Sequence, residues 1–361
     1  MRVLMICPEL PSDNSPGSMA PGARQIRSIR EAGLDVHVVD MRGIPKLKYL
    51  QVLPKIRGHL KRVDIIHAHF GYCGWLALLA RRTPHRKVPI VMSFMGDDLL
   101  GTPYNAAGDL ERWSLVAANW NKSIASRYDQ VIVKSQEMAD RLNPISCHVI
   151  PNGVDTTVFH PINFFEANHL LGRDPTKLKV LFPGNPANPR KGYALAASAV
   201  ELASQKLNRG IELVLLWGVQ PDQVALYMNA CNAMLMTSLI EGSPNVVKEA
   251  LACDQCIVAV PVGDAHQLIQ GVSGCHCTQR DPQQIALALS EILSSTSRSS
   301  GRSAIEAKGL TLSQVAQQVI NVYQEALNIE QYDRNKVIPV RPAQPSHHSK
   351  VASTNSRQVP S

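Results

Sequence analysis

Short apolar runs alternate with helix-like stretches along this sequence, and the whole alternation occurs twice. In the first half the strand-sized runs are Val3–Ile6, Val36–Val39, Ile65–His67, Ile90–Phe94, Val131–Val133 and His148–Ile150. In the second half they are Val180–Phe182, Leu213–Trp217, Ala233–Met236 and Cys256–Val260. Strands that alternate with helices form parallel sheets with helices on both faces. The pattern therefore predicts an α/β protein with two doubly wound, Rossmann-like domains in tandem.

The boundary between the predicted domains falls at the turn-forming cluster 151–155. We expect one Rossmann-like domain over residues 1–150 and a second over 151–330, because 361 residues exceed what one core usually supports. A late amphipathic helix, Ser313–Leu327, is expected to seal the second domain or to cross back to the first. Residues 331–361 carry five Lys or Arg and one Asp among Pro, Ser and Gln, which predicts a disordered basic tail.

The sequence favours a reducing compartment and no export. It has no apolar run long enough to span a bilayer, and Met1–Cys7 enters a strand without a secretory signal pattern. We therefore expect a cytoplasmic protein whose eight cysteines are buried thiols. The cluster Cys253, Cys256, Cys275 and Cys277 with His276 has poor spacing for a zinc site, so no metal is expected there.

The segment after the run Ala233–Met236 carries the strongest chemical signal. Gly242 allows close backbone approach, Ser243 suits a helix N-cap, and Pro244 suits the first helical position. Free amides at such a helix start hold a phosphate without a dedicated cation. The expected contacts with a phosphate-bearing ligand come from Ser243, Pro244, Asn245 and Val246.

Two glutamates complete this segment. Glu241 precedes the predicted helix and should point toward the cleft, and Glu249 lies where its carboxylate could accept both hydroxyls of a ribose. The string Glu-Gly-Ser-Pro, with a second Glu eight positions after the first, resembles the signature of retaining family-four glycosyltransferases of the GT-B type. Without that resemblance, both glutamates would be interpreted as the solvated side of a helix.

The resemblance implies a second anchor, where Gly184 precedes a loop carrying Arg190, Lys191 and Gly192. A departing diphosphate develops negative charge, and two adjacent cations stabilise that charge most in the transition state. The resemblance thus assigns Glu241, Arg190 and Lys191 to catalysis, and it assigns Gly184, Arg190, Lys191 and Glu249 to the donor.

Further stretches resemble family landmarks over almost the whole range from Arg2 to Leu327. They are Ile66–Gly71, Ser93–Asp98, and Ile150–Asp155 with Phe159. The resemblance implies the GT-B fold, a nucleotide-sugar donor, retention of anomeric configuration, and usually no bound metal. We expect the donor to be a UDP or GDP sugar and no cofactor to be needed. As acceptor we expect a glycan or a lipid-linked sugar, as in polysaccharide biosynthesis.

The sequence departs from the family pattern at Met95, where many relatives carry a histidine beside the reacting sugar. Methionine neither accepts a proton nor donates a strong hydrogen bond, so Asp97 or Asp98 is expected to substitute as a catalytic group. His67 and His69 are nearby, although a histidine at the end of a buried strand is more often a core residue.

The opening loop Pro8–Gly22 takes the place of the glycine-rich turn of the relatives, and Gly17 is the expected donor contact there. The loop is not a Gly-x-Gly-x-x-Gly fingerprint, which disfavours a dinucleotide.

A second basic cluster is interleaved with apolar residues over 46–62. Lys46, Lys48, Lys55, Arg57, Lys61 and Arg62 could form an amphipathic face on an anionic membrane, or the solvated side of a packed helix interrupted by Pro54. No platform for nucleic acid accompanies the charge.

Three functions stay open on the sequence alone. The first is a retaining hexosyltransferase. The second is a non-catalytic sugar-nucleotide binder, which is consistent with Met95 in place of the family histidine. The third is a nucleotide-sugar epimerase of the same architecture.

Overall fold

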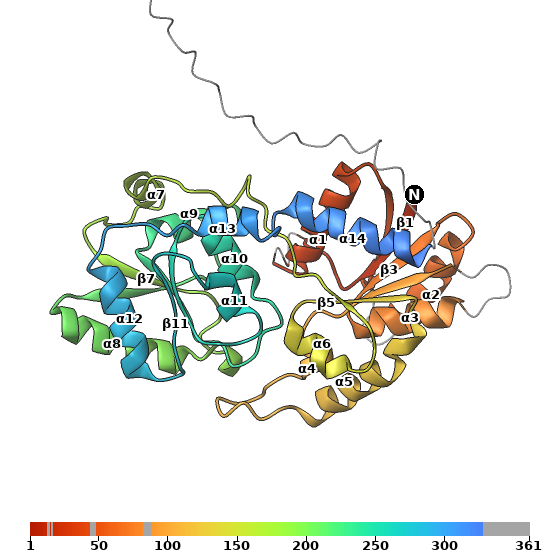
Figure 1. Ribbon diagram of the computed structural model, residues 1–361, viewed down its shortest axis with the longest axis horizontal. Helices are drawn as coiled ribbons and strands as arrows, with labels where there is room; N and C mark the ends of the chain where they lie inside the picture. The colour runs from red at the N-terminus through yellow and green to blue at the C-terminus, as the bar shows by residue number, and fades with distance from the viewer. Residues whose placement is uncertain (13–14, 16, 44–47, 82–87, 328–361) are drawn as a thin grey trace, which may run out of the picture.

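The computed structural model describes residues 1–12, 15, 17–43, 48–81 and 88–327, and Figure 1 shows two α/β domains side by side. The expected basic tail over 331–361 and the cluster residue Lys46 lie outside the described residues. Both domains are built on parallel sheets, which confirms the predicted fold class.

The N-terminal sheet has six parallel strands in the order β2-β1-β3-β4-β5-β6. They are β1 (Arg2–Cys7), β2 (Asp35–Asp40), β3 (Ile65–His69), β4 (Ile90–Ser93), β5 (Gln130–Val133) and β6 (His148–Val149). The runs of β1 and β3 to β5 are buried almost throughout, because a parallel sheet is covered on both faces.

Helices cover both faces of this sheet. One face packs against α2 (Lys48–His59), α3 (Gly71–Arg81), α5 (Arg112–Ile124) and α6 (Gln136–Leu142). The other packs against α1 (Ala20–Glu31) and α14 (Leu312–Ala326). A short helix, α4 (Asp97–Leu100), packs along α5, and the 3-10 turn η1 (Ala125–Arg127) directly follows α5.

The last helix returns to the first domain. A capping box of Thr311 and Gln314 starts α14, which lies beside α1 on the N-terminal sheet (Figure 1). Its inward stripe, including Val315, Val319 and Tyr323, is almost fully buried. Of the two expected positions for the late helix, the structure shows the crossover to the first domain.

The C-terminal sheet has five parallel strands in the order β11-β10-β9-β7-β8. They are β7 (Leu178–Phe182), β8 (Ile211–Leu215), β9 (Ala233–Met236), β10 (Cys256–Ala259) and β11 (Cys275–Cys277). Strand β11 is absent from the sequence prediction, because a three-residue, half-exposed edge strand has no apolar run.

Helices of the second domain divide in the same way. Those on one face are α8 (Tyr193–Leu207) and α12 (Pro282–Leu293). Those on the other are α9 (Val224–Ala230), α10 (Asn245–Ala252), α11 (Ala265–Ile269) and α13 (Gly301–Ala307). The remaining elements are α7 (Phe164–Leu170), η2 (Pro189–Lys191) and η3 (Pro221–Gln223).

The cysteines are free thiols, and most are buried. Cys253 and Cys256 pack into the clusters on opposite faces of the second sheet. Among the described residues, no group of three or more His, Cys, Asp or Glu side chains is placed to hold a metal ion.

The basic helix α2 is a packed helix that buries Val52 and Ile56. Pro54 lies inside it and does not interrupt it, contrary to the sequence interpretation. No helix in the described part of the chain is both long enough and apolar enough to cross a bilayer.

Candidate active site

The predicted cations and Glu241 meet at the carboxyl ends of β7 and β9. The 3-10 turn η2 places Arg190 and Lys191, and Asn188 caps this turn by accepting a bond from the Arg190 amide at 3.0 Å. The Lys191 ammonium donates to Glu241 Oε1 at 2.7 Å, and Arg190 Nη1 lies 3.4 Å from Glu241 Oε2. Two adjacent cations therefore share one carboxylate.

The two cations set the protonation of Glu241. Burial raises the pKa of this carboxyl, but Lys191 and Arg190 outweigh burial and hold the pKa below its usual value of 4.5. Glu241 is thus a carboxylate at neutral pH, and it neutralises part of the positive charge of the loop.

Asp97 brings the other domain into the same group. It starts α4 after β4, and its Oδ1 lies 3.6 Å from Arg190 Nη1. Burial raises the pKa of Asp97, and Glu241 adds to this while Arg190 opposes it. One guanidinium therefore links carboxylates from both halves of the chain.

Asp98 lies beside Asp97 but faces away from these cations. Its Oδ1 accepts hydrogen bonds from the amides of Met95 and Gly96, both at 2.9 Å, and its Oδ2 accepts one from the Gly71 amide at 3.0 Å. Burial raises the pKa of Asp98 to about 6 despite these three bonds. The Asp98 carboxylate ties the loop after β4 to the start of α3, and the structure brings only Asp97 to the cations.

Two glycines allow close packing around the loop that carries the cations. A Cβ on Gly184 would lie 2.9 Å from Lys191 Cγ, and one on Gly192, where φ is +69°, would lie 2.3 Å from the Thr237 carbonyl oxygen. The Thr237 hydroxyl donates to the Lys191 and Gly192 carbonyls at 3.0 Å. A side chain at Gly192 would therefore push the cation loop away from β9.

The start of α10 differs in detail from the prediction. The helix begins at Asn245, with Pro244 in the N-cap position, and Ser243 is not the cap. The Ser243 hydroxyl donates instead to Asp264 Oδ2 at 2.7 Å and accepts from the Lys248 ammonium at 2.8 Å. Buried charged partners compete for the hydroxyl, which explains why local capping preference fails here. Val246 follows in the first turn of α10.

The two domains approach each other closely at Gly242. A Cβ there would lie 3.3 Å from both Gly96 Cα and the Met95 carbonyl oxygen of the first domain, and 3.1 Å from Met138 Sδ. The half-buried Met95, at the family histidine position, thus lies in the loop that contacts the glutamate motif.

Glu249 also links the two domains. Its Oε1 accepts a hydrogen bond from Arg24 Nη2 of α1 at 2.6 Å, and the Arg24 guanidinium lies over the ring of Phe159. The sequence predicts a ribose contact for this carboxylate and gives no sign of Arg24, which is 225 residues away.

The two histidines differ. His67 is a satisfied core residue, with hydrogen bonds of 2.7 Å to the Tyr323 hydroxyl and 2.8 Å to the Ser93 hydroxyl. His69 is buried, and neither ring nitrogen has a hydrogen-bond partner among the described residues. Burial, with a smaller contribution from Lys134, lowers the pKa of His69 to about 3.

Two buried lysines were missed by the sequence interpretation. Burial, aided by repulsion from Lys248, lowers the pKa of Lys134 to about 7, and burial lowers the pKa of Lys248 to about 8. Lys134 and Asp264 line a pocket of about 640 Å³ whose wall includes Ser135 of the first domain and Gly263 of the second. The sequence feature that could have indicated a buried lysine is the position of Lys248 within an otherwise apolar stripe of a helix.

Gly17, the expected donor contact in the opening loop, lies before α1 with nothing within 4 Å of its Cβ position. The structure does not bring it into contact with the other predicted site residues.

Two parallel-sheet α/β domains with their strand-end loops in contact define the GT-B class. Solved structures agree: the chain superposes with TM-score 0.72 on sucrose-phosphate synthase of Thermosynechococcus elongatus, at 18% identity over 91% of this chain and 100% of that one. Anabaena HepE, solved in complex with UDP, gives TM-score 0.64 at 18% identity, over 90% and 100% of the two chains.

Sequence comparison identifies two family regions in the chain. Residues 2–158 match Glycosyltransferase Family 4, and residues 192–295 match Glycosyl transferases group 1. The chain therefore belongs to the glycosyltransferases that combine these two regions, as the motifs predicted.

Curated relatives are distant. A D-inositol 3-phosphate glycosyltransferase of Mycobacterium ulcerans is 26% identical over 66% of this chain, which spans 58% of that relative's length. An uncharacterized glycosyltransferase of Methanocaldococcus jannaschii is 22% identical over 71% of this chain and 73% of its own length.

Proposed function

We propose that this chain transfers a hexose from a nucleoside diphosphate sugar to a glycan or lipid-linked acceptor, with retention of anomeric configuration. The observation that carries the proposal is the shared contact of Arg190 with Glu241 and Asp97, directly beside Lys191. Anabaena HepE, which is solved in complex with UDP-glucose, has the same fold.

In this proposal the two cations receive the charge of the departing diphosphate. Lys191 and Arg190 are paired with Glu241, and the pyrophosphate would take over part of that pairing. Cations aimed at a developing negative charge lower the barrier more than they strengthen ground-state binding. The amides of Asn245 and Val246 would hold a phosphate at the start of α10.

Asp97 contacts Arg190 from the other domain. Since Met95 offers no proton acceptor, we assign the contact with the reacting sugar or the acceptor hydroxyl to Asp97. Asp98 is the positioning residue that holds the loop, through its bonds to the Met95 and Gly96 amides. Glu249 would bind the ribose after exchanging its bond with Arg24.

We also propose that the reaction needs no metal, because Arg190 and Lys191 supply the positive charge that a divalent cation supplies elsewhere. Full activity in excess EDTA is the expected result. Activity that is lost in EDTA and restored by Mg²⁺ or Mn²⁺ would contradict this part of the proposal.

The test is to incubate the purified chain with a panel of UDP and GDP sugars and to follow nucleoside diphosphate release, with and without oligosaccharide or polyprenyl-linked acceptors. Thermal shift selects the donor first, because a specific ligand raises the apparent melting temperature. Proton NMR of the product then reports the anomeric configuration.

Two other outcomes correspond to the competing functions. Donor binding without any turnover would indicate a non-catalytic binder, and a new nucleotide sugar formed from donor alone would indicate an epimerase. Either result rejects the transferase proposal.

A further inference from the structure

Helices α3 and α5 leave an apolar face uncovered on the first domain. On α5, Trp113, Val116 and Trp120 follow one another at i, i+3 and i+7, and they are 69%, 69% and 56% exposed. Leu79 and Trp75 of α3 are also exposed. Three of the four tryptophans of the chain lie on these two helices. A contiguous exposed apolar patch of this kind marks an interaction surface.

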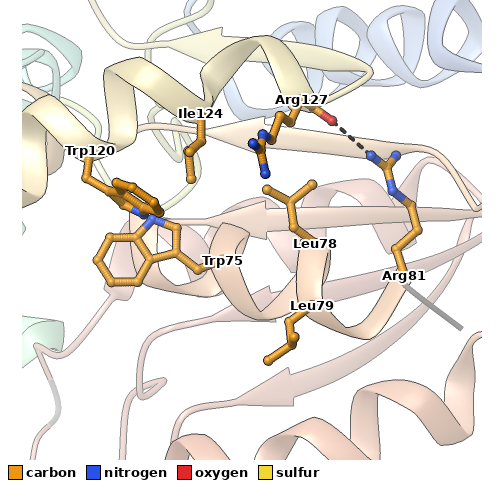
Figure 2. Close-up of a pocket in the computed structure, with 7 residues that line it drawn as sticks. All are labelled: Trp75, Leu78, Leu79, Arg81, Trp120, Ile124 and Arg127. Carbon is orange, nitrogen blue, oxygen red and sulfur yellow. Dashed lines mark hydrogen bonds between the residues drawn. The ribbon is translucent and has the colours of Figure 1, made fainter.

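A groove of about 520 Å³ runs along the same face. Figure 2 shows Trp75 and Trp120 at one end of this groove, and Arg81 and Arg127 at the other. Leu78, Leu79 and Ile124 line the space between them. The groove is thus apolar along its length and cationic at one end.

The two helices carry positive charge only, although Glu111 immediately precedes α5 and Asp129 follows η1. Segments 71–81 and 112–127 contain Arg81, Arg112, Lys122 and Arg127 and no Asp or Glu. Arg81 is paired with Asp129. The other three make no ion pair with any residue in the described part of the chain, so their charge is available to a partner.

Hydrogen bonds connect the face to the candidate active site. The Trp75 indole N–H donates to Asn121 Oδ1 at 2.7 Å, and the Asn121 amide donates to the Asp98 carbonyl at 2.8 Å. Asp98 in turn holds the Met95 and Gly96 amides next to Asp97. The Trp75 end of the face is therefore joined through Asn121 to the loop that carries Asp97.

We propose that the α3–α5 face docks on the surface of a bilayer that contains anionic phospholipid. Indole rings have an apolar body and a polar N–H, which suits the interface between headgroups and acyl chains. Unpaired cations at the rim are attracted to anionic headgroups. The basic helix α2 is a weaker candidate, because it buries Val52 and Ile56 and exposes Tyr49 and Leu50 but no tryptophan.

The first experiment is co-sedimentation of the full chain with vesicles of phosphatidylcholine, and with vesicles of equal parts phosphatidylcholine and phosphatidylglycerol. Binding to the anionic vesicles alone is expected. The double variant Trp113→Ala/Trp120→Ala should lower the partition coefficient by about tenfold or more. The matched control is Trp217→Ala, since Trp217 is equally exposed, at 61%, but lies in the second domain.

A charge comparison locates the cationic part of the surface. Arg112→Gln/Lys122→Gln/Arg127→Gln should reduce binding to anionic vesicles, whereas Lys55→Gln/Arg57→Gln/Lys61→Gln on and after α2 should leave it unchanged. The reverse result would assign the membrane contact to α2 and overturn the proposal. Unchanged melting temperatures in all variants exclude a folding defect as the cause.

Fluorescence provides a readout that does not depend on loss of binding. In a Trp217→Phe background every remaining tryptophan belongs to α3 or α5, so a blue shift of emission on adding anionic vesicles reports burial of this face. No shift, or no sedimentation of the wild-type chain, overturns the proposal. Concentration-dependent dimers that the Trp113→Ala/Trp120→Ala variant abolishes, without vesicle binding, would instead make the face a subunit contact.

Discussion

The ammonium of Lys191 lies 2.7 Å from Glu241 Oε1, and this contact joins the two motifs that the sequence separates by fifty residues. The loop of η2 and the loop before α10 are also linked by the bond from the Leu239 amide to the Arg190 carbonyl at 2.8 Å. Because the backbones are joined, the position of the cations relative to Glu241 does not depend on the side chains alone. The pair is preorganised for an anion that displaces the carboxylate.

Lys191→Ala should weaken binding of UDP or GDP about 10- to 100-fold, because one charge-assisted hydrogen bond to the pyrophosphate is lost. Isothermal titration calorimetry checks this with the donor that thermal shift selects. Lys177→Ala is the control, since Lys177 is an exposed lysine of the same domain. Equal affinity of the Lys191→Ala variant and the wild-type chain would argue against the donor site.

Glu241→Gln should destabilise the donor-free chain by about 1–3 kcal/mol, because it leaves Lys191 and Arg190 without their carboxylate. The pKa of Glu241 is held below 4.5 in the folded state, so its stabilising contribution is present above pH 4.5. The contribution disappears as the pH falls below 4.5 through the folded pKa. Urea unfolding of both proteins across this range should show a difference that is constant above pH 4.5 and shrinks below it.

Gly192→Ala should lower both stability and donor affinity. The backbone at residue 192 is left-handed, with φ +69°, which is strained for alanine. The added Cβ would also lie 2.3 Å from the Thr237 carbonyl oxygen. Gly218→Ala is a matched control, because Gly218 has φ +72° and open space around its Cβ position. Backbone strain alone costs about 1–3 kcal/mol, so any larger loss in Gly192→Ala measures the clash. Equal melting temperatures for the two variants would show that β9 and the cation loop are not in close contact.

Gly242→Ala should slow sugar transfer several-fold while leaving the stability of the second domain almost unchanged. The new methyl group would meet Gly96 Cα and the Met95 carbonyl oxygen at 3.3 Å, which holds the domains apart. Steady-state kinetics checks this against Gly210→Ala, an open position in the same domain. Identical turnover in both variants would mean that closure at Gly242 is not needed.

Lys134→Met should stabilise the chain by about 1–3 kcal/mol near neutral pH, because a buried cation is replaced by an apolar side chain of similar size. The pKa of Lys134 is about 7 in the folded chain and 10.5 ordinarily. Between these pH values Lys134 is therefore protonated in the unfolded chain and mostly neutral in the folded chain. The advantage of the Lys134→Met variant is therefore complete below about pH 7 and shrinks toward pH 10.5. Urea unfolding at both ends of this window measures it, and Lys122→Met, on the surface helix α5, is the control.

The fold class and the central motif followed from local patterns. A buried parallel strand needs a continuous apolar run, and runs such as Val131–Val133 are visible without any tertiary information. Gly242 and Glu241 belong to one continuous segment, so their role could be proposed from the resemblance of that segment to the family signature.

The tertiary structure alone decided which of two adjacent aspartates faces the cations, Asp97 and not Asp98. It also decided the partner of Glu249, which is Arg24 from the other end of the chain. The physical reason is that periodicity records which side chains are buried, whereas the meeting of two distant loops depends on how complete domains pack. The same reason separates Val52, which the packing of α2 buries, from Trp113, which α5 leaves exposed.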